Sequence, residues 1–104
     1  MYSRTGRTEQ RMRAGVVVCI RNLEHSELAE STTTENVSRT GLRVIAKRRW
    51  LESTPVVVES PPGRLRSRGW VVYCQPEKNG DFAVGLRLLV PQPDWTRKDE
   101  MAPH

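Results

Sequence analysis

Two short patterns of polar residues are the parts of this sequence that could bind a ligand. Arg7 and Arg11 lie four residues apart, ahead of the first hydrophobic run. About 25 residues later comes the segment 36–41, Asn-Val-Ser-Arg-Thr-Gly. Arginine carries a planar fork of donors that suits phosphates, carboxylates and guanine edges, and it stacks on flat rings. In this order, the two patterns favour an anion receptor over an enzyme.

The arginine pair has little weight alone, because arginine is frequent here. Fourteen of the 104 residues are arginine, and about two R-x-x-x-R pairs are expected by chance. Three occur, and the other two span residues 39–43 and 64–68. The pattern [DN]-x-S-x-x-G is rarer, with a chance expectation of about 0.03 per chain. The second pattern therefore singles out Arg7 and Arg11 from three similar pairs.

The side chains of Asn36 and Ser38 should point the same way, because residues two apart on a strand share a face. Both are short polar groups that can hydrogen-bond a base edge or the backbone of an adjoining turn. Gly41 suits a left-handed backbone or a close approach to another strand. A plain β-turn, in which Asn36 and Ser38 bond backbone amides, is an alternative that these residues leave open.

Six short segments rich in β-formers, separated by turn signals, would position these residues. The segment 28–37 has three consecutive threonines and suggests an exposed, edge-like strand, although residues 28–30 could instead begin a short helix. Ser-Pro-Pro-Gly at 60–63 and Lys-Asn-Gly-Asp at 78–81 are strong turn signals. The expected strands cover residues 15–20, 28–37, 42–46, 55–59, 64–74 and 82–88.

This pattern predicts an all-β protein, a small six-stranded antiparallel barrel whose closure removes exposed strand edges. The barrel should span residues 14–90. Residues 1–13 form a polar, arginine-rich arm without periodicity, which we expect to be flexible and to order on contact. Residues 91–104 form a tail that could dock through Trp95. A chain of 104 residues is one domain with a modest core.

Composition limits the possible functions. With 17 basic and 12 acidic residues, the net charge of +5 suits an anionic partner, although a solvated basic surface also explains it. Cys19 and Cys74 lie in apolar stretches and not at metal-ligand spacing, so we expect reduced core thiols, with a disulfide as the alternative, and no metal or other cofactor. No histidine neighbours a nucleophile or a carboxylate pair, which argues against an enzyme. With no leader and no run of the ~18 apolar residues that a membrane span needs, we expect a soluble, cytoplasmic protein.

The chain resembles the PilZ domain, the bacterial receptor module for cyclic di-GMP. The resemblance rests on the segments 7–11 and 36–41, together with Gly-Trp-Val-Val-Tyr at 69–73 and Ala-Val-Gly-Leu-Arg-Leu at 83–88. It covers roughly residues 7–89. It implies second-messenger signalling by a six-stranded barrel, with the arginine segment wrapping over the nucleotide.

The resemblance also implies residue roles. Arg7 and Arg11 would contact guanines and phosphates, Asn36 and Ser38 would recognise a guanine edge, and Gly41 would hold the turn. Asn36 stands where the family pattern also allows aspartate, so a carboxylate acceptor for guanine N–H groups is missing. The family often binds cyclic di-GMP as an intercalated dimer, which implies one or two ligands per chain.

The function expected from this resemblance is a stand-alone cyclic di-GMP receptor or adaptor. Its arm would order over the ligand and change a surface that a protein partner reads. The main alternative is a PilZ-like interaction module that docks a protein without binding nucleotide. A third hypothesis is a basic barrel that binds nucleic acid, which the small number of aromatic residues disfavours.

Overall fold

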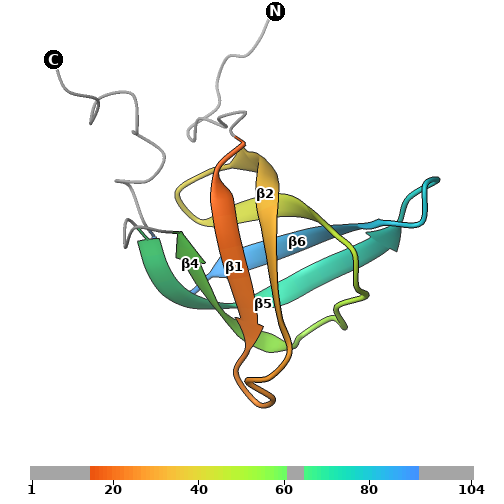
Figure 1. Ribbon diagram of the computed structural model, residues 1–104. Helices are drawn as coiled ribbons and strands as arrows, with labels where there is room; N and C mark the ends of the chain where they lie inside the picture. Colours follow the sequence, from red (N-terminus) through yellow and green to blue (C-terminus); the bar gives the residue numbers. More distant parts are fainter. Residues whose placement is uncertain (1–14, 61–64, 92–104) are drawn as a thin grey trace, which may run out of the picture.

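The computed structural model describes residues 15–60 and 65–91. Six strands form a closed antiparallel barrel in the order β1-β2-β3-β6-β5-β4 (Figure 1). This confirms the predicted all-β class and six-stranded barrel. The expected arm at 1–13 and nearly all of the tail lie outside the described residues. The strands are β1 (Val17–Asn22), β2 (Ala29–Val37), β3 (Gly41–Ala46), β4 (Pro55–Ser60), β5 (Leu65–Pro76) and β6 (Phe82–Leu88).

The barrel interior is filled by small branched side chains from alternate strand positions. This spacing places every second residue on the inner face, and β-branched residues pack well on a pleated surface. Their removal from water is the main force that stabilises the barrel. The largest of the fully buried side chains, each less than 2% exposed, are Val18, Ile20, Val37, Val44, Val56, Val58, Val71 and Val84.

The strand β2 is not the edge strand that its composition suggested. Its residues 29–33 pair with β1, and its segment 34–37 pairs with β3. It resembled an edge because Thr34 and Val37 are the buried positions among its nine residues. Closure of the barrel gives β2 two neighbours while leaving one of its faces in water. The helix considered for residues 28–30 is also wrong, since β2 begins at Ala29.

The connection between β3 and β4 is tied to β2 by one carboxylate. Glu30 accepts hydrogen bonds from the backbone N–H groups of Lys47 and Arg48, the latter at 3.3 Å. It also accepts the indole N–H of Trp50 at 3.0 Å. Trp50 is only 5% exposed and belongs to the hydrophobic core. The charged connection is therefore anchored at both its backbone and its aromatic residue.

The two cysteines are free thiols, and of the two Cys74 packs against the core cluster. Cys19 and Cys74 are both partly exposed on the barrel wall, and Cys74 Sγ accepts the backbone N–H of Trp50 at 3.4 Å. Within residues 15–60 and 65–91, no group of three or more His, Cys, Asp or Glu side chains is placed to hold a metal ion. The same part of the chain contains no helix of the length and apolarity required to cross a membrane.

Candidate functional site

Two β-bulges shape the outer face of the barrel between β2 and β5. The pairing of β2 with β3 skips Glu35, and the pairing of β5 with β6 skips Val72. A bulge breaks the strict alternation of a strand, so two consecutive side chains can lie on one side. Glu35 and Asn36 both lie on the outer face, as do Val72 and Tyr73. The bulges therefore add two outward side chains to the same face.

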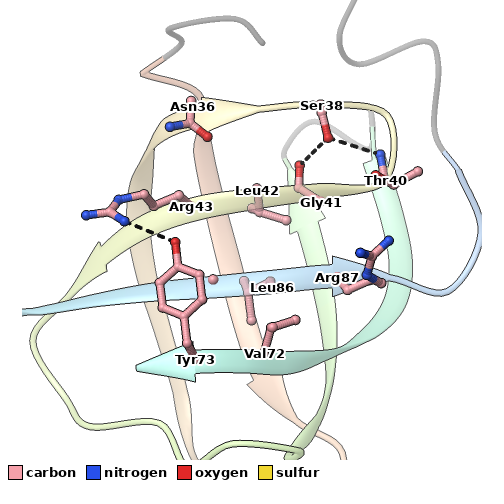
Figure 2. Close-up of a pocket in the computed structure, with 11 residues that line it drawn as sticks. Asn36, Ser38, Thr40, Gly41, Leu42, Arg43, Val72, Tyr73, Leu86 and Arg87 are labelled. Atoms are coloured by element: carbon pink, nitrogen blue, oxygen red, sulfur yellow. Dashed lines mark hydrogen bonds between the residues drawn. The ribbon is translucent and has the colours of Figure 1, made fainter. Parts of the chain in front are cut away.

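Between the bulges, a row of directly paired residues crosses four strands. Asn36 of β2 pairs with Arg43 of β3, Arg43 pairs with Gly85 of β6, and Gly85 pairs with Tyr73 of β5. With strands ~4.8 Å apart, the row spans about 14 Å. A Cβ atom at Gly85 would lie within 3.0 Å of the Tyr73 ring. The missing side chain thus lets the ring lie across β6 and reach Arg43 (Figure 2).

The guanidinium of Arg43 is fixed in this row by two strands. Its Nε donates to the Glu35 carboxylate at 2.6 Å, and its Nη1 donates to the Tyr73 hydroxyl at 3.0 Å. Its central carbon lies 5.9 Å from the Tyr73 ring centre, within the range of cation–π attraction. The hydrogen bond to Glu35, followed by the one to Tyr73, raises the pKa of Arg43 above its ordinary value. Arg43 is therefore a permanently charged and well-positioned group.

This row borders a groove of about 570 Å³ on the outer face. Figure 2 shows that β2, β3, β5 and β6 and the turn after β2 all contribute to it. Arg87 of β6 is exposed at the groove and pairs directly with Gly41. It forms no ion pair with any residue that the structure describes. The lining residues are Asn36, Ser38, Thr40, Gly41, Leu42, Arg43, Val72, Tyr73, Gly85, Leu86 and Arg87.

The turn between β2 and β3 is held by Ser38 and Gly41. The backbone N–H of Ser38 donates to the Gly41 carbonyl at 2.8 Å, and the Ser38 hydroxyl accepts the backbone N–H of Thr40 at 3.3 Å. A Cβ atom at Gly41 would lie 2.6 Å from the backbone oxygen of Leu86. Of the two reasons expected for glycine here, close approach of a neighbouring strand is the one the structure supports, because no positive φ occurs at Gly41.

Asn36 differs from Ser38 in how its side chain is used. Asn36 is half-buried beside the groove, and its amide makes no hydrogen bond within the described residues. An amide offers both a donor and an acceptor, so this group can meet the edge of a base. The plain-turn alternative therefore describes the Ser38 hydroxyl but not the Asn36 amide.

The structure brings together three of the five residues that the sequence indicated. Asn36, Ser38 and Gly41 all line the groove. Arg7 and Arg11 lie outside the described residues, so their place at the site stays a prediction. The structure therefore describes only the part of the proposed site that the barrel strands and the β2–β3 turn contribute.

Sequence reasoning missed Arg43, Tyr73 and Arg87 as groove residues. Arg43 belonged to an arginine pair that chance could explain, yet its position two residues after Gly41 places it on the same face of β3. That spacing was a usable signal. Tyr73 and Arg87 come from strands far along the chain, and only the β3–β6 and β5–β6 registers bring them here.

Comparison with known proteins gives a match to one family model and to solved structures. The family model for the PilZ domain matches residues 5–98. No curated protein matches the sequence. The structure of the Bacillus subtilis Inhibitor of motility (MotI/DgrA) superposes with a TM-score of 0.66 and 14% identity, covering 94% of this chain. The match covers 53% of that protein's own chain, and at this identity it shows a shared fold.

Proposed function

Because the chain belongs to the PilZ domain family, we propose that it is an adaptor that binds cyclic di-GMP in the groove of β2, β3, β5 and β6. The observation that carries this proposal is Asn36. Its amide is half-buried, has no internal partner in the described residues and borders a groove that also holds two arginines. Such a polar group on a rigid strand is suited to recognising a ligand.

The chemistry of the groove fits that of the ligand. Cyclic di-GMP is a dianion with two guanines, and a guanine edge offers acceptors at O6 and N7 and donors at its N–H groups. The Asn36 amide can pair with either kind of atom. Arg87 supplies forked donors for a phosphate. Arg43 adds positive charge, although its Nε and Nη1 already donate to Glu35 and Tyr73. The groove volume of about 570 Å³ lies within the usual range for small-molecule sites.

In this proposal, Arg7 and Arg11 complete the site from the segment before β1. The family model begins its match at residue 5 and so includes both arginines. Contact with the ligand would order residues 1–13 against the barrel. Such an ordering step would change the outer surface that a protein partner meets.

Calorimetric titration with cyclic di-GMP at low salt tests the proposal. We expect a Kd in the submicromolar to micromolar range that weakens as salt screens the charges, with GTP and cyclic di-AMP as ligand controls. Asn36→Ala, Arg7→Ala and Arg11→Ala should each weaken or abolish binding. Arg48→Ala is the matched control, because Arg48 is an exposed arginine that does not line the groove.

A folded sample that releases no heat with cyclic di-GMP at low salt would refute this function. The remaining PilZ-type function would then be protein docking without nucleotide. A pull-down from cell extract whose captured partner is indifferent to added cyclic di-GMP would support that alternative.

A further inference from the structure

Trp70 is a large aromatic side chain exposed on the outer face of β5, next to the groove. Its side chain is 37% exposed. Its direct cross-strand partners are Pro55 of β4 and Arg87 of β6, and Arg87 in turn pairs with Gly41. Directly paired residues on one face of a sheet have Cβ atoms about 4.5–5.5 Å apart. Trp70 is thus the immediate neighbour of an arginine that lines the groove.

About two thirds of this side chain is covered, since Trp70 pairs with Pro55 as well as with Arg87, and the exposed remainder lies on the outer face. The residues on either side of it, Gly69 and Val71, are buried, so alternation directs Trp70 outward. Its indole N–H donates no hydrogen bond within the described residues. A tryptophan of this kind contrasts with Trp50, which is 5% exposed and bonded to Glu30. Packing on the neighbouring strands therefore leaves more than a third of the Trp70 side chain open to a ligand.

The surface around Trp70 is basic. Arg68 and Arg87 are exposed on the same outer face, and neither forms an ion pair within the described residues. Arg66 of the same strand differs from them, because it is paired with Glu59 of β4. Exposed aromatic rings next to free cations are typical of sites where a base stacks and its phosphate is neutralised. The surface therefore fits an anionic aromatic ligand.

We infer that Trp70 is a stacking platform for a guanine base whose phosphate lies at Arg87. The inference rests on the proposed function and adds a second base position to the same site. Asn36 lies on β2 and Trp70 on β5, three strand spacings or about 14 Å apart across the face. The two positions therefore hold different bases, one read at its edge by Asn36 and one stacked on Trp70.

Affinity measurements on Trp70 variants test the platform. Loss of a base–aromatic stack should raise the Kd for cyclic di-GMP roughly 5- to 100-fold in Trp70→Ala. Trp70→Phe should keep most of the affinity because it retains a flat ring, whereas Trp70→Leu should behave like the alanine variant. Leu51→Ala is the control, since Leu51 is an exposed apolar residue (65%) in the β3–β4 connection and not on the outer face of β5.

Tryptophan fluorescence gives an independent readout in the full chain. A Trp95→Phe background leaves Trp50 and Trp70 as emitters, and Trp50 is buried in the core. We expect saturable quenching by cyclic di-GMP with the Kd found by calorimetry. We expect no quenching when Trp70→Phe is added. Acrylamide should quench the fluorescence of Trp70 before ligand is added. Bound cyclic di-GMP should then protect Trp70 from acrylamide.

The outcomes separate this inference from the proposed function. Absence of any binding by the unmodified chain refutes the proposed function itself. If Trp70→Ala and Trp70→Leu bind as tightly as the unmodified chain while Asn36→Ala binds weakly, the function stands and the platform is wrong. Shielding of Trp70 from acrylamide without ligand would also overturn it, because another part of the chain would then cover the ring.

Discussion

Glu30 and Asn36 are polar residues on one strand, and the protein uses them in opposite ways. Near the start of β2, Glu30 accepts three hydrogen bonds, two from the backbone of the β3–β4 connection and one from the indole of Trp50. Near the end of β2, the Asn36 amide has no hydrogen-bond partner within the described residues. The first region satisfies its polar groups internally, and the second presents one to a groove.

This difference predicts that stability and binding are separable in the barrel. An internal acceptor stabilises the fold because its loss leaves donors unsatisfied. An open group contributes little to the fold but can bind a ligand at small reorganisation cost, because the strands around it are rigid. Variants at the two regions should therefore change different measured quantities.

The largest effect is expected for Glu30→Ala. Two backbone N–H groups and the indole N–H of Trp50 would lose their acceptor, so the free energy of unfolding should fall by about 2–4 kcal/mol. Chemical denaturation measures this change. Glu24→Ala, at an exposed position, should stay within about 0.5 kcal/mol. If folded Glu30→Ala bound cyclic di-GMP much more weakly than the unmodified chain, the two regions would not be separable.

A smaller loss of stability is expected for Gly85→Ala. The new methyl group would meet the ring of Tyr73, and overpacking of this kind costs about 1–3 kcal/mol. The displaced ring would also release Arg43, so the Kd for cyclic di-GMP should rise. Adding Tyr73→Ala to Gly85→Ala should recover the stability but not the affinity. Failure of this rescue would mean that the ring does not set the need for glycine.

Arg43→Ala should affect binding more than stability. Its ion pair with Glu35 is partly exposed, and such pairs are worth about 0–1 kcal/mol. Calorimetry should show a Kd about tenfold higher, which corresponds to ~1.4 kcal/mol, while Arg48→Ala leaves the Kd unchanged. An unchanged Kd for Arg43→Ala would remove this arginine from the site.

Arg43 should add no pH dependence to stability near neutrality. A raised folded-state pKa gives a contribution that is complete below the ordinary pKa of arginine and lost only as pH rises through the folded value. Both limits are far above neutral pH. Thermal unfolding of the unmodified chain and of Arg43→Ala should therefore differ by the same amount at mildly acidic and mildly basic pH. A difference that grows or shrinks across that range would contradict the assignment.

The smallest effect is expected for Tyr73→Phe. This change removes the hydroxyl that accepts from Arg43 but keeps the ring over Gly85. One such hydrogen bond contributes about 0.5–1.5 kcal/mol, and the Kd should rise only a few-fold. A loss of affinity as large as that of Arg43→Ala would show that the hydroxyl itself contacts the ligand.

The barrel was predictable because its signals are local. Runs such as 16–20 and 56–58 are rich in β-branched residues, and turn residues separate the strands. The turn at residues 36–41 was predictable for the same reason. The composition of β2 alone did not show that it has a neighbour on each side, since an exposed strand and an edge strand have similar composition.

The part of the groove that β5 and β6 contribute was not predictable, because it depends on the register in which these strands pair. The bulges at Glu35 and Val72 break the alternation from which strand faces are inferred, and no residue pattern in the sequence marks either one. Tyr73 and Arg87 reach the groove through strand pairing over long sequence separations. Arg43 lay within reach of sequence reasoning, but its spacing from Gly41 became meaningful only once β3 and its outer face were known.

The closed order of the strands restricts how this protein can pass on a signal. Each of the six described strands already has two hydrogen-bonded neighbours, so none of them offers a partner an edge that is unpaired along its whole length. Recognition then depends mainly on the side chains of the outer wall and on whatever is bound to them. A nucleotide held against β2, β3, β5 and β6 would itself become part of the epitope. The messenger would act as a component of the interface, and the barrel would not need to change its shape.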